Sequence, residues 1–241
     1  FLDARPEERE IRLKLAGILV AMQRTEEAEG LYRKMLLQEP GAGDVLFAMA
    51  RLKMAEKDFI DAEEWARRAV AASVERGESR ILLGNVLVAL HRYDEARRVY
   101  REAATAGSVL AATLGMGRSY VKEGMPESAR QVFAQAMETA PGDVEVRFQA
   151  AGPEKIAEGE FIEEIIRTEG SPRRLTRWAG LYAAEGRRKE AIRIYEAVLS
   201  RDPAFFPAQV ELAEILALDE RFDRSITLYG EIAARFPGAS K

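Results

Sequence analysis

The side chains that could carry out chemistry are few in this sequence, and they do not form an arrangement that a reaction would need. The chain has one His and no Cys, so a thiolate nucleophile or a His–Cys metal site is excluded. His91 falls in a predicted turn between two helices, where exposure to solvent accounts for it. The paired acids Glu26 with Glu27 and Glu163 with Glu164 lie on amphipathic segments, and no glycine-rich phosphate loop is present. We therefore expect a protein that is not an enzyme and holds no metal or cofactor.

The composition is that of a folded chain without a strong charge bias. The 241 residues include 36 Lys and Arg against 40 Asp and Glu, which gives a net charge of −4. This slightly acidic balance argues against binding to nucleic acid or to an anionic membrane surface. No stretch approaches the roughly 20 apolar residues of a membrane-spanning helix, so no membrane insertion is expected. Hydrophobic residues make up 47%, which is too many for a disordered chain.

One short pattern recurs along the chain: a turn, an aromatic or apolar residue, an acid, and then Ala or Ser at the start of an amphipathic helix. The final residue of the pattern is Ala28, Ala62, Ala96, Ala129, Ala191 and Ser225. The intervals between these residues are 34, 34, 33, 62 and 34. A small residue stands twelve positions before each of them, and a large apolar residue precedes the small one. Each period predicts two antiparallel helices of roughly three to four turns that approach each other closely.

These residues and their period resemble the tetratricopeptide repeat (TPR) family, and the resemblance covers nearly all of the chain. It implies an all-α fold, a right-handed superhelical solenoid of antiparallel helix pairs. Residues 1–8 are expected to end an upstream repeat, 9–143 to form repeats 1–4, 144–171 to form an irregular, shortened acidic repeat, and 172–241 to form repeats 6 and 7. Because Pro6 stands 34 residues before Pro40, which closes the first full repeat, we expect the chain to be a fragment of a longer array.

The irregular repeat is predicted from the one long interval, which spans 62 residues where two periods give 68. Six residues are therefore missing. Gly152 and Pro153 predict a break or kink in its first helix. The second helix is expected to be short, from residue 161 to about residue 169. Ser171 followed by Pro172 predicts an N-cap and first turn for the next helix.

In TPR proteins the first helix of each repeat lines a concave groove, and the resemblance assigns groove positions to this chain. At the ninth position of three successive repeats stand Arg51, Asn85 and Arg118. Such a row could bind peptide backbone or carboxylates, Arg with two donors and Asn as donor and acceptor. Apolar residues at the fifth and twelfth positions would flank the row wherever they do not pack between repeats. The apolar candidates are Phe47, Ile81, Met54 and Val88.

The negative charge of the chain is concentrated in the irregular repeat. Residues 143–171 hold eight acids and three bases, a net charge of −5 against −4 for the whole chain. A solvated connector explains such a run. The alternative is an acidic patch that docks a basic protein partner. Its candidate residues are Glu154, Glu158, Glu160, Glu163 and Glu164.

The sequence thus favours a non-enzymatic scaffold for protein–protein interaction, which binds protein partners through the groove, the acidic patch or both. The chain also resembles the periplasmic TPR region of Gram-negative exopolysaccharide export proteins of the Pel or cellulose type. That resemblance implies recruitment of partner enzymes in the periplasm. A cytoplasmic regulatory or assembly protein is the alternative. Direct contact with polysaccharide would require exposed groove aromatics, and Phe47 is the only aromatic residue at the assigned groove positions.

Overall fold

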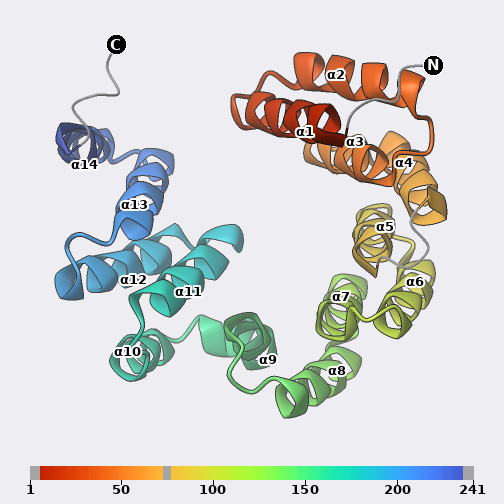
Figure 1. Cartoon of the computed structure of the whole chain (residues 1–241). Coiled ribbons are helices and arrows are strands. Elements are labelled where there is room, and N and C mark those ends of the chain that lie inside the picture. The colour runs from red at the N-terminus through yellow and green to blue at the C-terminus, as the bar shows by residue number, and fades with distance from the viewer. Residues whose placement is uncertain (1–5, 73–76, 236–241) are drawn as a thin grey trace. The chain divides into compact units, whose positions relative to one another are not determined.

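The computed structural model describes residues 6–72 and 77–235, and every regular element in this part is a helix. Consecutive helices pack against each other in pairs, and within each of the chain's two compact parts each pair packs against the next (Figure 1). The expected all-α solenoid of helix pairs is therefore confirmed. The chain divides into two compact parts, the N-terminal part (residues 1–139) and the C-terminal part (residues 140–241).

The N-terminal part contains four stacked helix pairs within its described residues. The helices are α1 (Pro6–Ala21), α2 (Thr25–Gln38), α3 (Gly43–Ala55), α4 (Phe59–Ala72), α5 (Gly77–Ala89), α6 (Tyr93–Thr105), α7 (Val109–Glu123) and α8 (Pro126–Thr139). Helix α1 begins at Pro6, and the boundary expected at residues 1–8 stays a prediction. Residues 1–5 lie outside the described residues.

The C-terminal part contains three further pairs, of which the first is irregular. Its described helices are α9 (Val144–Ile156), α10 (Gly159–Thr168), α11 (Pro172–Ala184), α12 (Arg188–Arg201), α13 (Phe206–Leu218) and α14 (Phe222–Ala234). The side chain of Ser171 accepts a hydrogen bond from the Arg174 backbone N–H, and Pro172 is in the first turn of α11, as the sequence predicts.

In the N-terminal part an aromatic ring from the second helix of a pair reaches small residues on the first helices. The ring of Tyr100 (α6) lies against Gly84 (α5) and Gly115 (α7), so closely that a Cβ at either glycine would come within 2.4 or 2.5 Å of it. Phe133 (α8) meets Gly117 (α7) in the same way. The glycines therefore set how closely neighbouring helices approach.

The turn inside each regular pair contains one residue in the left-handed conformation, always at the same repeat position. These residues are Gln23 (φ 59°), Lys57 (63°), His91 (60°), Gly124 (81°), Gly186 (75°) and Glu220 (62°). Such a residue ends a helix by letting its backbone N–H bond to carbonyls of the last turn. His91 thus occupies a turn, as predicted, and its Nδ1 lies 2.7 Å from the Tyr93 hydroxyl.

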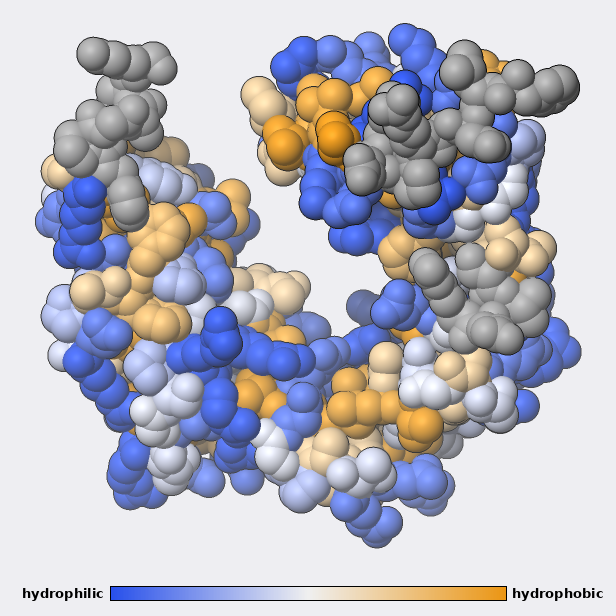
Figure 2. All heavy atoms as spheres, viewed as in Figure 1, coloured by the Kyte–Doolittle hydropathy of each residue, from blue (hydrophilic) through white to orange (hydrophobic). Residues whose placement is uncertain are grey.

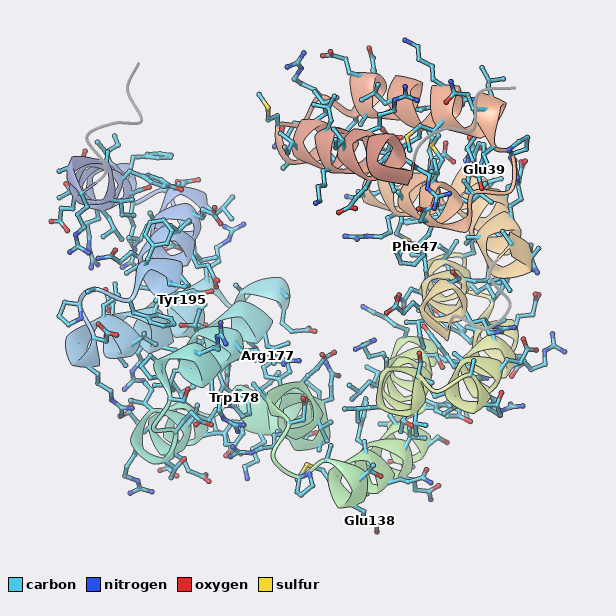
Figure 3. All side chains as sticks on the ribbon, in the orientation of Figure 1. Glu39, Phe47, Glu138, Arg177, Trp178 and Tyr195 are labelled. Atoms are coloured by element: carbon cyan, nitrogen blue, oxygen red, sulfur yellow. The ribbon has the colours of Figure 1, made fainter. Side chains whose placement is uncertain are left out.

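The irregular pair departs from the others as the sequence predicts. Gly152 has φ 73° and ψ 168°, a conformation that interrupts α9 directly before Pro153. Helix α10 has 10 residues, whereas the equivalent helix α12 has 14. Buried Trp178 of α11, which is labelled in Figure 3, joins the two helices of the irregular pair, because its ring lies 6.1 Å from that of Phe148 on α9 and 6.0 Å from that of Phe161 on α10, measured between ring centroids.

The shortened helix is held at its C-terminal end by a side chain of the next pair. The guanidinium of Arg201 (α12) donates hydrogen bonds to the backbone carbonyls of Ile166 and Glu169. Arg187 similarly donates to the carbonyl of Ile156, at the end of α9, over 3.4 Å. Both arginines satisfy carbonyls that a helix terminus leaves without an internal partner.

Helix α1 presents an apolar face to solvent, and hydrophobic surface is visible on the α1–α2 pair in Figure 2. Ile11, Leu15 and Ile18 are 47–65% exposed on this face. The residues that lie 34 positions further on, Val45, Met49 and Leu52 of α3, are buried against the core of the N-terminal part. The exposed face of α1 therefore has the residue pattern by which α3 packs within the stack.

The left-handed turn residues predict opposite effects for the same substitution. Lys57→Gly should raise the free energy of unfolding by about 1 kcal/mol, since a side chain in this conformation costs about 1–2 kcal/mol. Lys34→Gly, at an exposed position inside α2, should lower it by about 1 kcal/mol because glycine is a poor helix former. Urea unfolding followed by circular dichroism measures both effects. Equal effects of the two variants would contradict the role assigned to the turn.

Candidate functional site

The predicted polar row lies on three neighbouring helices of the N-terminal part. Arg51 is on α3, Asn85 on α5 and Arg118 on α7, and α5 packs against both of the other helices. Arg51 is exposed, whereas Asn85 and Arg118 are half-buried. The three side chains come from the first helices of successive pairs, as the ninth position of each repeat requires.

A tyrosine hydroxyl joins two members of the row. The hydroxyl of Tyr100 donates a hydrogen bond to Oδ1 of Asn85 over 2.8 Å. Burial raises the pKa of Tyr100 above its usual range, and the nearby guanidinium of Arg118 opposes this effect. Asn85 is therefore oriented with its amide oxygen occupied, and its NH₂ group remains as the donor. The sequence did not predict Tyr100 as part of the row, because packing alone explains a bulky residue at this repeat position. In the structure it does pack between Gly84 and Gly115.

Arg51 has a similar neighbour one pair earlier. Tyr32 of α2 is buried, which raises its pKa, while the guanidinium of Arg51 acts in the opposite direction. Each arginine of the row thus lies near the hydroxyl end of a tyrosine that crosses from the second helix of the preceding pair. The buried tyrosines therefore place a hydroxyl group next to polar residues of the first helices.

The predicted apolar residues beside the row are neither fully buried nor fully exposed. The N-terminal part has two hydrophobic clusters, one that includes Met49 and one that includes Tyr100. Phe47 packs against both clusters, and Met54, Ile81 and Val88 pack against the one that includes Tyr100. All four keep part of their surface accessible. Each side chain can therefore stabilise the stack with one side and contact a partner with the other.

The acidic residues of the irregular pair are mixed with bases in space. A surface hollow of about 840 Å³ is lined by Glu158, Glu160, Glu163 and Glu164, together with Lys155, Arg167 and Arg193. Arg193 of α12 forms an ion pair with Glu163. The ammonium of Lys155 lies 4.9 Å from the centre of the Phe161 ring. The surface around the hollow is consequently less negative than the net charge of residues 143–171 indicates.

The C-terminal part has a pocket that the sequence-based assignment did not single out. It has a volume of about 520 Å³ and is formed by α11, the start of α13 and the segment between α12 and α13. Glu211 lines the pocket, and its Oε2 accepts a hydrogen bond from the Tyr195 hydroxyl over 2.7 Å. Gly180, the ninth residue of its repeat, leaves the space above this pair open. Arg173, at the second position, was the signal that could have indicated the pocket.

The polar neighbours of Tyr195 differ from those of Tyr100. Both Glu211 and Glu214 raise the pKa of Tyr195, after burial as the main cause. Near Tyr100 the corresponding neighbours are Asn85 and the cationic Arg118. The same tyrosine position therefore meets cationic and amide chemistry in the N-terminal part and carboxylate chemistry in the C-terminal part.

Among the side chains that the structure describes, His, Asp and Glu form no cluster of three that could bind a metal ion. No helix in the described part of the chain has the length and apolar composition needed to cross a membrane.

A comparison with protein families matches the tetratricopeptide repeat model to residues 87–152 and 182–240. No curated protein matches the chain. The similar solved structures include a tetratricopeptide repeat protein from Parabacteroides merdae, with a TM-score of 0.59 and 16% identity over 88% of this chain and 85% of that one. PilF of Pseudomonas aeruginosa has a TM-score of 0.56 and 20% identity over 88% of this chain and 100% of that one. TTC0263, a TPR protein from Thermus thermophilus, has a TM-score of 0.51 and 21% identity, with coverages of 86% and 98%.

The bond between Tyr100 and Asn85 predicts a pH-dependent difference in stability. Tyr100→Phe should lower the free energy of unfolding by about 0.5–1.5 kcal/mol at neutral pH, since it removes one hydrogen bond. The folded chain raises the pKa of Tyr100, so the stability it contributes is complete below the unfolded pKa of about 10 and is lost above it. The difference between wild type and variant should therefore shrink as pH rises above about 10. Chemical unfolding at neutral and alkaline pH measures this, and a difference that does not change with pH would contradict it.

Proposed function

Since the chain belongs to the tetratricopeptide repeat family, we propose that it is a non-enzymatic scaffold that binds a segment of a partner protein along α3, α5 and α7. TPR proteins act as scaffolds for protein interaction, which supports the general role. The observation that carries the specific proposal is the oriented Asn85 amide beside the half-buried Arg118, both next to the Tyr100 hydroxyl. Together with Arg51 they would hold backbone carbonyls or carboxylates of the segment.

The apolar residues next to the row fit an occupant that has an apolar side. Phe47, Met54, Ile81 and Val88 would cover that side, while the row pairs with polar groups of the same segment. The proposal keeps the boundaries predicted from the sequence, in which residues 9–143 form repeats 1–4, and the groove belongs to these repeats. The acidic patch would serve as a second docking surface for a basic region of the partner.

The finer proposal places this scaffold in exopolysaccharide export or envelope assembly, where it would recruit partner enzymes in the periplasm. This placement rests on the resemblance seen in the sequence. The structures reported above are at most 21% identical to the chain and support the fold alone. A regulatory or assembly scaffold in the cytoplasm is the alternative, and the compartment of the captured partner distinguishes the two.

Charge reversal of the row tests the groove. We expect Arg51→Glu combined with Arg118→Glu to abolish retention of the partner that wild-type protein captures from its native source, while helicity is unchanged. Reversal removes two donors and places negative charge against the bound carboxylates. The matched control is Arg101→Glu with Arg130→Glu, which makes the same charge change at exposed positions of α6 and α8. If the Arg51→Glu, Arg118→Glu variant retained the partner at wild-type affinity, the proposed groove would be wrong.

Neutralisation of the acidic patch tests the second surface. Replacement of Glu154, Glu158, Glu160 and Glu164, the acids of the patch without an ion pair among the described residues, by Gln should weaken binding of the same partner and flatten its dependence on salt concentration. The control replaces four exposed acids of the N-terminal part, Glu26, Glu64, Glu127 and Glu138, by Gln. Affinity measured across a series of salt concentrations gives both quantities. If neither changes in the patch variant, these acids belong to a solvated connector.

A further inference from the structure

The pocket of the C-terminal part combines an opening over a glycine with an arginine that forms no ion pair with any described residue. We propose that this pocket binds an extended peptide segment in which an acidic side chain stands next to an apolar one. The inference rests on the scaffold function proposed above, because it adds a second recognition site to the same chain. It concerns different residues, in a different part of the molecule, from the row of Arg51, Asn85 and Arg118.

The space for an apolar side chain exists because Gly180 has no side chain. A Cβ at this position would meet only the Tyr195 hydroxyl at 3.9 Å and Oε2 of Glu211 at 4.0 Å. In four other repeats the ninth position carries a polar side chain, at Arg51, Asn85, Arg118 and Glu214. The cavity of about 520 Å³ over Gly180 is bordered by the apolar side chains of Leu181, Phe205 and Pro207. An inserted apolar side chain would bury these surfaces from water.

The acidic requirement comes from two arginines on one face of α11. Arg173 and Arg177 are four residues apart, so both lie at the pocket on successive turns of the helix. Arg177 is engaged with α9, with its guanidinium 3.4 Å from Glu145 and 4.0 Å from Asp143. Arg173 is exposed and, among the described residues, forms no ion pair. A carboxylate of the peptide that pairs with Arg173 would add a bidentate contact without displacing an internal one.

The extended conformation of the segment is proposed from the remaining carboxylate acceptor in the pocket lining, Glu211. Oε2 of Glu211 receives the Tyr195 hydroxyl, which fixes the orientation of the carboxylate. The second oxygen, Oε1, is not used by that bond and would accept a backbone N–H of the bound peptide. A backbone that is not helical offers such an N–H next to the inserted side chain. The pocket would thus contact one apolar side chain, one carboxylate and one peptide group.

The experiment uses the full chain as bait for a phage-displayed library of random linear peptides. We expect enrichment of sequences that place Asp or Glu beside a large apolar residue. Synthetic peptides of the enriched sequence should bind Gly180→Leu at least about tenfold more weakly than wild type, which corresponds to about 1.4 kcal/mol. Leucine would occupy the cavity itself, and it should stabilise α11 because glycine is unfavourable inside a helix.

Two controls separate the pocket from general effects. Gly30→Leu places the same side chain at a helical glycine of α2 that also has open space around it, and it should bind the peptides like wild type. Arg173→Glu should abolish binding, whereas Arg188→Glu, an exposed arginine of α12, should not. Thermal unfolding followed by circular dichroism confirms that all four variants are folded.

The outcomes decide between the two proposals. Enrichment of basic in place of acidic peptides, no enrichment at all, or acidic–apolar peptides that bind Gly180→Leu normally would each overturn the inference. Peptides whose binding depends on Arg51 and Arg118, but not on Gly180 or Arg173, would overturn the inference and leave the proposed groove function intact. Loss of binding in Gly180→Leu and Arg173→Glu, with normal binding in the controls, would support the pocket even if the Arg51 and Arg118 variant kept its partner.

Discussion

The contact on which the structure depends is an aromatic ring that passes from the second helix of a pair into the space left by small residues on the first helices. Tyr100 against Gly84 and Gly115 shows why both partners are needed, since a methyl group at either glycine would overlap the ring. The contact fixes the distance between successive first helices. It also determines which atoms come to lie beside polar residues of the first helices. The para substituent of the ring, a hydroxyl in Tyr and a hydrogen in Phe, is the group that reaches them.

This second consequence connects packing to recognition. Phe133 ends in a carbon atom and contributes only to the core. Tyr100 and Tyr195 occupy the same repeat position, but their hydroxyls emerge beside Asn85 and Glu211, respectively. The stack therefore presents a hydroxyl at intervals along its first helices, and the residues around each hydroxyl set the local preference for carboxylates, amides or donors. Changes at those residues alter what is bound without changing the contact that holds the helices together.

The sequence was sufficient for features that depend on local spacing and on backbone chemistry. The period of 34 residues, the interruption at Gly152 and Pro153, and the short α10 all follow from residues whose effect is local. Features that depend on how far a side chain reaches could not be predicted in this way. Lys57 and His91 give no sign of a left-handed conformation, because the surrounding helices impose it. The capping of α10 by Arg201 and the bond from Tyr195 to Glu211 join residues of different helices, and their distances are set by packing.

The charge of the irregular repeat shows most clearly why a sum along the sequence differs from a surface. Residues 143–171 total −5, yet several of their acids are paired with arginines from the repeat that follows. Glu145 meets Arg177, Glu169 meets Arg174 and Glu163 meets Arg193. These pairs join α9 and α10 to α11 and α12, where a shortened helix offers less apolar surface for packing. The acids without an ion pair in the described part, Glu154, Glu158, Glu160 and Glu164, are then the ones free to act on a partner. A test that neutralised paired and unpaired acids alike would mix loss of packing with loss of docking, so the unpaired acids are the informative ones.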